Sequence, residues 1–272
     1  MKFLALSLFV IGVFLFEPFT NGAQAVEQAH AQKSDKPLYS LRNYQKVKVF
    51  YDLTAEQAVK IGLENNIPPA AILAIAGWES GYGQGYVAQI TGNIMSLGAR
   101  KGEAELPPLK LPRNLKTDQI MIDIDEAKKM PKDQVVWQQR PPSLKKDYRP
   151  KPSAGTSDNL LYFREHPIAL KQAYAQVMQD FSSSWISKKS QVPVFFNAAK
   201  NMDQLVKNEG KAILLNCKVA KAFVKSIGGQ PRSFNTRPAW IKHVYSIMDN
   251  AGLCPLTEEM YKGKSFKLAW LR

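Results

Sequence analysis

The sequence predicts a mainly helical (α+β) protein with one small β-containing insertion. Apolar residues recur at helical spacing on both sides of a central stretch, residues 100–158, whose composition is different. Eight of the chain's 17 prolines fall in that stretch, and sequence rich in proline and charge does not form long helices. Two short apolar runs inside it, at 120–124 and 135–137, predict strands that pair as a hairpin. We therefore expect an inserted small lobe or flap, and the competing interpretation is a loop without regular structure.

Two helices are expected before the insertion. Residues 26–50 are polar and are expected to be extended. The first helix is expected to begin at Thr54, because residues 54–57 have a threonine followed three residues later by a glutamine, which is a capping pattern. Asparagines at 65–66 end this helix, and prolines at 68–69 open the next, since proline is tolerated in a first turn. The two helices predict an αα-hairpin.

The second helix of that hairpin ends in a carboxylate. Residues from Ala70 to Trp78 are small or apolar at every position, and Glu79 follows them directly. Gly81 and Gly83 come next, and glycine just past a helix end is a stop signal. Glu79 is therefore expected in the last turn, where unpaired carbonyls carry partial negative charge. That charge and the apolar neighbours predict a raised pKa, as a general acid needs. The alternative is a surface glutamate at a frayed helix end.

Helices are expected again in the C-terminal part. One begins at Pro167 and carries an apolar stripe that includes Ile168. A short helix is expected at 203–209 and a longer one at 212–227, which a pair of glycines ends. Thr236 is expected to cap a final long helix that ends at Gly252. The main domain is thus expected at 51–253, followed by a C-terminal tail at 254–272.

The charge and the first residues indicate an exported protein with an anionic partner. The 272-residue chain has a net charge of +14. A basic surface fits nucleic acid, a lipid surface or an acidic polysaccharide. Residues 1–25 have a lysine, an apolar run and an Ala-Gln-Ala cleavage site, which is the layout of a secretory signal peptide; an uncleaved anchor is the alternative. Export favours a periplasmic or extracellular location, and a cell-wall polymer or membrane surface over nucleic acid.

The cysteines predict a disulfide. Cys217 and Cys254 are the two cysteines of the chain, and an exported protein with two cysteines is expected to join them. Two buried free thiols are the alternative. The three histidines are scattered, with no spacing typical of metal ligands, so we expect neither a metal nor another cofactor.

Three segments resemble the glucosaminidase family of peptidoglycan hydrolases, which includes flagellar and autolysin-type enzymes. The first has Trp-Glu-Ser-Gly-Tyr-Gly at 78–83 and Gly-Asn-Ile-Met-Ser-Leu-Gly at 92–98. The second, Tyr-Phe-Arg-Glu-His-Pro at 162–167, is similar to a phenylalanine-arginine segment that precedes a helix in the family. The third, Ser-Phe-Asn-Thr-Arg-Pro at 233–238, is similar to a tyrosine-x-threonine-aspartate-proline segment before the last helix. The resemblance covers residues 50–100 and 160–253.

The resemblance implies a lysozyme-like helical lobe and hydrolysis of the β-1,4 bond after N-acetylglucosamine. The catalytic acid of the family would be Glu79. A second carboxylate would lie in the inserted lobe, where Glu103 and Glu105 are the first candidates in order. The next candidates are Asp118, Asp123 and Asp125. A substrate-assisted route, in which the N-acetyl group is the nucleophile, would need no second carboxylate from the protein.

Further residues are candidates for binding the glycan strands of peptidoglycan. Aromatic side chains beside a carboxylate can stack on sugar rings, although simple packing is the alternative for each of them. Asn93 would either help to close the site or only form a turn. The substrate-binding candidates are Tyr82, Tyr86, Asn93, Trp137, Tyr162 and Phe234.

Two departures from the family's third segment leave other functions open. Phe234 stands where the family has a tyrosine, so a hydroxyl is missing, and Arg237 stands where it has an aspartate. Tyr82, Tyr86 or Tyr162 would have to supply the hydroxyl. A catalytically weak wall-binding or scaffold protein is therefore one alternative. A lytic transglycosylase is another, although the glycine-leucine-methionine-glutamine segment typical of those enzymes is absent from the sequence.

Overall fold

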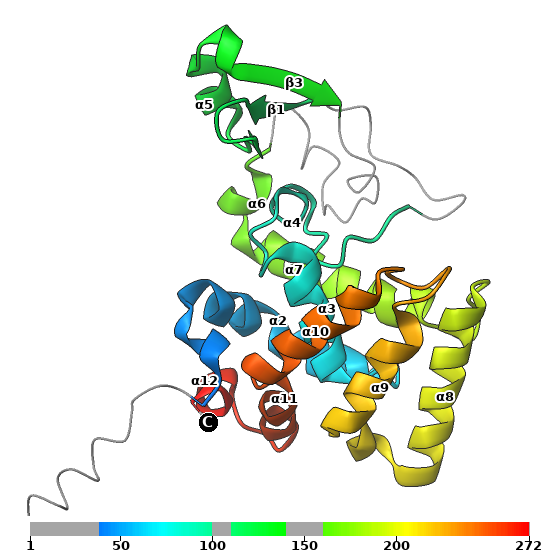
Figure 1. Cartoon of the computed structure of the whole chain (residues 1–272). Coiled ribbons are helices and arrows are strands. Elements are labelled where there is room, and N and C mark those ends of the chain that lie inside the picture. Colours follow the sequence, from blue (N-terminus) through cyan, green and yellow to red (C-terminus); the bar gives the residue numbers. More distant parts are fainter. Residues whose placement is uncertain (1–37, 100–109, 140–159, 272) are drawn as a thin grey trace, which may run out of the picture. The chain divides into compact units, whose positions relative to one another are not determined.

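The computed structural model describes residues 38–99, 110–139 and 160–271, which fold mainly as helices with one three-stranded sheet (Figure 1). This confirms the expected fold class. The first helical elements, before the sheet, are η1 (Ser40–Asn43), α2 (Gln45–Glu64), α3 (Pro69–Ser80) and α4 (Tyr86–Thr91). Those after it are α6 (Tyr162–Glu165), α7 (Pro167–Asp180), η4 (Phe181–Trp185), α8 (Pro193–Glu209), η5 (Lys211–Leu215), α9 (Cys217–Ile227), α10 (Pro238–Asn250), α11 (Leu253–Tyr261) and α12 (Phe266–Trp270).

Helix α3 is the centre of the core. Every residue from Pro69 to Gly77 is buried, and the helix contacts α2, α9, α10 and α11 around it (Figure 1). It opens at the expected prolines and ends at Gly81, whose φ of 56° is in the left-handed region that glycine adopts without a steric penalty. The prediction that Glu79 lies in the last turn of a buried apolar helix is confirmed.

The expected start of the first helix is wrong. Helix α2 begins at Gln45, and Thr54 lies inside it, fully buried, with its hydroxyl donating to the backbone oxygen of Phe50 at 2.8 Å. A threonine inside a helix can satisfy its hydroxyl through the carbonyl four residues earlier, so its presence does not mark a helix start. Val47, Phe50 and Tyr51 are buried too, which shows that the apolar face of α2 extends into the segment expected to be extended.

The small sheet contains a strand that the sequence did not predict. Strand β1 (Lys110–Asn114) lies between β2 (Gln119–Ile120) and β3 (Val135–Gln139), and both pairings are antiparallel. Strand β1 contains Pro112, and proline is rare in a central strand because it has no N–H for the ladder. The backbone oxygen of Pro112 accepts a hydrogen bond from Met121 N at 2.7 Å. The edge of β1 at which Pro112 lacks an N–H therefore faces away from β3, and the ladder between β1 and β3 loses no hydrogen bond.

The expected strands are only partly correct. The run at 135–137 is confirmed as part of β3, but the strand expected at 120–124 ends at Ile120. Asp123 accepts hydrogen bonds from Asp125 N and Glu126 N and so caps α5 (Ile124–Lys129), which η2 (Lys132–Gln134) follows. The two predicted strands pair with β1 and not with each other.

Helix boundaries in the C-terminal part differ from those expected. The helix expected at 203–209 is the end of the longer α8, and the one expected at 212–227 is divided at Asn216, whose side chain accepts from Lys218 N. Thr236 makes no capping bond; Asn235 Oδ1 accepts from Arg237 N at 3.0 Å instead. Ile168 is 76% exposed. It lies six residues before Tyr174, which is a rotation of about 240° around the helix, so its side chain does not share the apolar stripe of Tyr174.

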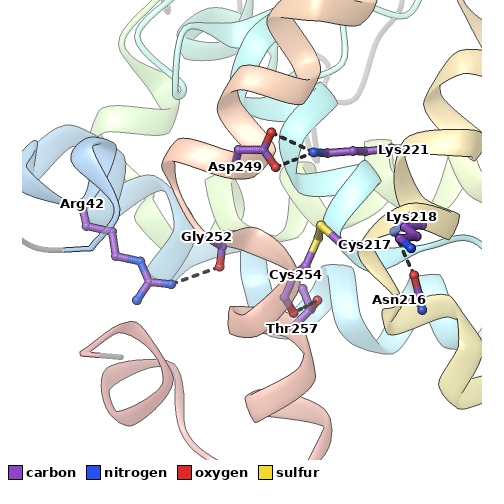
Figure 2. Close-up of a disulfide and its surroundings, with 9 residues drawn as sticks. All are labelled: Arg42, Asn216, Cys217, Lys218, Lys221, Asp249, Gly252, Cys254 and Thr257. Carbon is purple, nitrogen blue, oxygen red and sulfur yellow. Dashed lines mark hydrogen bonds and ion pairs between the residues drawn. A yellow bond between two sulfur atoms is a disulfide. The ribbon is translucent and has the colours of Figure 1, made fainter.

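The residues expected to form a tail are helical and belong to the core. Trp270 of α12 packs on Tyr51 with ring centroids 5.8 Å apart, and Arg42 donates to the backbone oxygens of Ala251 and Gly252 at 3.0 and 3.1 Å. The predicted Cys217–Cys254 disulfide is confirmed and joins the start of α9 to α11 (Figure 2). These contacts fix the C-terminal helices around α3.

Within the described ranges, no helix combines the length and the apolar character that a membrane span requires.

Candidate active site

The carboxylate of Glu79 is held by side chains from a distant part of the sequence. Glu79 is partly buried at the end of α3, and its Oε1 accepts from Trp240 Nε1 at 2.7 Å. The side chain of Asn235 also hydrogen bonds to this carboxylate. Both donors come from the segment that enters α10, so the contact between α3 and α10 fixes the position of the carboxylate.

Burial raises the pKa of Glu79 above its usual value, and this is the largest effect on the group. The hydrogen bonds from Trp240 and Asn235 lower the pKa, because they stabilise the charged form, but they do not offset burial. The direction agrees with the prediction from the sequence. A carboxyl group with a fixed position and a raised pKa can carry a proton and deliver it to a leaving oxygen.

An aromatic cluster fixes Trp240 itself. Trp240 is 2% exposed, and Phe234 lies 5.7 Å from it between ring centroids, with Phe181 edge-on to Phe234 at 5.5 Å. A Cβ added at Gly228 would come within 2.3 Å of the Trp240 ring, so only glycine leaves room for the indole there. The indole N–H is therefore aimed at Glu79 by packing from several directions.

The loop after α4 also reaches Glu79. Ser96 Oγ donates to the backbone oxygen of Glu79 at 3.3 Å, which satisfies one of the last carbonyls of α3. Asn93 is fully buried; its Oδ1 accepts from Leu97 N at 3.0 Å and its Nδ2 donates to Leu97 O at 2.8 Å. In the structure Asn93 therefore closes a turn, and this turn belongs to the loop whose Ser96 hydrogen bonds to Glu79.

The residue before Glu79 in the sequence, Trp78, belongs to an exposed aromatic pair. Trp78 is 40% exposed, and its ring is stacked on His243 of α10 at 4.3 Å between centroids and 5° between planes. Trp78 and His243 extend the contact between α3 and α10 from the partly buried Glu79–Trp240 hydrogen bond to the surface. Sequence reasoning did not single out either residue as a site candidate.

The other predicted binding residues lie in several different surroundings. Tyr82 is half-buried, with its ring edge-on to Tyr51 at 6.1 Å between centroids, and burial raises its pKa. Tyr86 lines a cavity of about 740 Å³ that also involves β2 and the start of α5. Tyr162 is buried and stacked on His166, whereas Trp137 of β3 is 41% exposed. Phe234 is the one of these candidates that packs on Trp240.

The candidates for a second carboxylate are not brought to Glu79 by any contact among the described residues. Glu103 and Glu105 lie outside those residues. Asp118 pairs with Arg113, Asp123 caps α5, and Asp125 is exposed on that helix. In the part of the chain that the structure describes, no group of three or more histidine, cysteine, aspartate or glutamate side chains could hold a metal ion.

We expect Trp240→Phe to raise the pKa of Glu79 further, because the indole donor stabilises the ionised carboxylate. Loss of a hydrogen bond to a charged group is expected to cost about 1.5–3 kcal/mol of stability above the pKa of Glu79. Urea unfolding at several pH values would measure this cost. Trp185→Phe is the matched control, because the buried Trp185 N–H has no acceptor among the described residues. Equal effects of the two substitutions would contradict the assignment.

Comparison of the chain with protein-family models, with curated proteins and with solved structures finds no match.

Proposed function

We propose that the protein is an exported peptidoglycan hydrolase that cleaves the β-1,4 bond after N-acetylglucosamine, with Glu79 as general acid. The observation that carries the proposal is the environment of Glu79: a carboxyl group at the end of an apolar helix, with a raised pKa and a side chain held by Trp240 and Asn235. Burial of a carboxylate is costly, and among the described residues no cation pairs with Glu79; a perturbed pKa of this kind is typical of catalytic groups.

In the proposed reaction Glu79 gives its proton to the glycosidic oxygen as the bond to the anomeric carbon breaks. Water attacks the anomeric carbon, and its proton goes to a base. In the inverting route that base is a carboxylate about 6.5–9.5 Å from Glu79. In the substrate-assisted route the N-acetyl oxygen attacks the anomeric carbon first and forms an oxazolinium ion, and the water that then opens this ring gives its proton to the ionised Glu79. Glu103 and Glu105 remain the first candidates for the carboxylate, because Asp118 and Asp123 are engaged with Arg113 and the start of α5.

Two properties of the chain support this substrate. The net charge of +14 suits a polymer that carries carboxylates. Trp78, next to Glu79 in the sequence, is 40% exposed although His243 stacks on one face of its ring, and a half-exposed indole is a group of the kind that sugars stack on. The layout of residues 1–25 supports export to the periplasm or cell wall. The net charge of +14 also supports a peripheral association with the envelope. We propose neither a nucleic-acid partner nor a cofactor.

Digestion of purified sacculi tests the proposal. We expect soluble fragments with N-acetylglucosamine at the reducing end, identified by mass spectrometry after borohydride reduction. Fragments ending in anhydro-muramic acid would instead identify a lytic transglycosylase. Sedimentation of the protein with sacculi, without release of any soluble fragment, would identify a wall-binding protein and would overturn the enzymatic proposal.

The wall-binding alternative is favoured by one observation. Phe234 has no hydroxyl and packs on the Trp240 that holds Glu79, next to Asn235 in the sequence. A tyrosine at 234 would bring a hydroxyl to this position. Its absence favours the alternative, because the resembling family of hydrolases has a tyrosine there.

We expect Phe234→Tyr to raise the hydrolysis rate about tenfold, which is the effect of one additional transition-state hydrogen bond of about 1.4 kcal/mol. The rate of fragment release from sacculi measures it. Phe196→Tyr, at a 37% exposed position on α8, is the control for adding a hydroxyl elsewhere. An unchanged rate in Phe234→Tyr would show that the missing hydroxyl is not what limits the reaction.

A further inference from the structure

A second cavity has residues of the turn that follows Glu79 in its wall, among them Tyr82 and Gly83. It has a volume of about 240 Å³ and is bordered by α2, α7, the residues after α3 and the segment around α6. Its walls are mostly apolar and aromatic side chains, among them Phe50, Leu53, Phe163 and Leu170. Such a cavity suits the apolar part of a small ligand.

One hydroxyl of the cavity wall makes no hydrogen bond to any described residue. Tyr174 is only 3% exposed, lines the cavity, and its hydroxyl makes no hydrogen bond to any described residue. Burial raises the pKa of Tyr174 to about 12, so the hydroxyl keeps its proton and remains a donor. The hydroxyl lies against Gly83, another residue of the wall, where an added Cβ would be 2.9 Å from its oxygen. The hydroxyl oxygen is accessible from the cavity, so a ligand there can accept its hydrogen bond in place of water.

The charges of the lining are all positive. Lys46 and Arg164 line the cavity, both are exposed, and neither has an ion-pair partner among the described residues. None of the described residues of the lining is acidic. By contrast Lys171, elsewhere on α7, pairs with Glu56 of α2 at 3.9 Å. The two unpaired cations give the mouth of the cavity a preference for an anion.

We propose that this cavity binds a small amphipathic carboxylate. The apolar body lies between Phe50 and Phe163, an acceptor atom takes the hydrogen bond from Tyr174, and the carboxylate lies between Lys46 and Arg164. The cavity does not depend on Glu79, so this site stands whether or not the protein hydrolyses peptidoglycan. It is distinct from the glycan-binding candidates except at Tyr82, which is part of its wall.

Three probes that differ only in the head group test the proposal by isothermal titration calorimetry on the full chain. They are 4-phenylbutyrate, 4-phenylbutanol and 4-phenylbutylamine. We expect the carboxylate to bind about two- to thirtyfold more tightly than the alcohol, since each of its two exposed charge contacts makes only a modest contribution in water. The amine is expected to bind more weakly than the alcohol. Equal affinities for all three, or no binding of the carboxylate, would overturn the proposal.

Two variants test which residues recognise the carboxylate. Lys46→Met combined with Arg164→Met is expected to abolish the preference for carboxylate over alcohol. Tyr174→Phe is expected to weaken both about fivefold. Lys48→Met is the matched control, because Lys48 is also exposed on α2 but does not line the cavity. Loss of the preference in Lys48→Met, or its retention in the double variant, would show that the net charge of the protein, and not this site, attracts the probe.

Discussion

Glu79→Gln is expected to lower the rate of glycan hydrolysis by about 10²–10⁴-fold, the usual contribution of a general acid. Glutamine has the same shape, and its amide oxygen can still accept the hydrogen bond from Trp240 that Glu79 Oε1 accepts at 2.7 Å. It has no proton that it can give to a leaving oxygen. The variant should therefore bind sacculi as the wild type does and release soluble fragments far more slowly.

The same variant is expected to be more stable than the wild type at neutral pH. Burial raises the pKa of Glu79 in the folded state above its unfolded value, so ionisation opposes folding. The cost is absent below the ordinary pKa of 4.5, grows as the pH rises through the folded-state pKa, and is complete above it. Urea unfolding at pH 4 and pH 7.5 measures the difference. Glu56→Gln, at a side chain that is 73% exposed, is the control for both experiments. Wild-type hydrolysis by Glu79→Gln would show that Glu79 is not the general acid.

Removal of the Cys217–Cys254 disulfide is expected to cost about 3–4 kcal/mol, the loop-entropy value for cysteines 37 residues apart. The bridge joins α9 to α11 (Figure 2). Both helices contact α3, so loss of the bridge weakens the packing around the helix that carries Glu79. For a domain of this size the melting temperature should fall by about 10 °C. Calorimetry of the Cys217→Ser, Cys254→Ser double variant measures the change.

Reduction of the wild-type protein provides the internal check on that experiment. A reducing agent should lower the melting temperature of the wild type towards that of the double variant and leave the variant unchanged. The ion pair between Lys221 and Asp249 lies beside the bridge, with 2.7 Å between Nζ and Oδ1, and contains no group that either treatment changes chemically (Figure 2). A melting temperature that is insensitive to both the substitutions and the reducing agent would contradict a stabilising role for the disulfide.

The sequence predicted the position of Glu79 because the signals there are local. An uninterrupted apolar run predicts a buried helix, and Gly81 predicts where it ends. The partners of the carboxylate were not predicted, since Trp240 lies 161 residues away. A buried indole needs an acceptor and a buried carboxylate needs donors, but only the packing of α10 on α3 determines that these two meet.

The wrong predictions in the fold have the same origin. Thr54 has the local pattern of a helix cap, but the apolar face that begins at Val47 extends the helix past it. Strand β1 was not predicted at all, and it accommodates Pro112 because the missing N–H faces away from β3. In each case tertiary packing overrides a signal of a few residues.

Titration of the Glu79 side chain by carbon-13 NMR tests most directly whether this carboxyl group is suited to donate a proton. We expect the midpoint to lie above the ordinary value of 4.5, because burial outweighs the two hydrogen bonds to the ionised form. The midpoint should be higher still in Trp240→Phe. A midpoint at or below 4.5 in the wild type would mean that Trp240 and Asn235 hold a permanent anion, and Glu79 would then not be the acid.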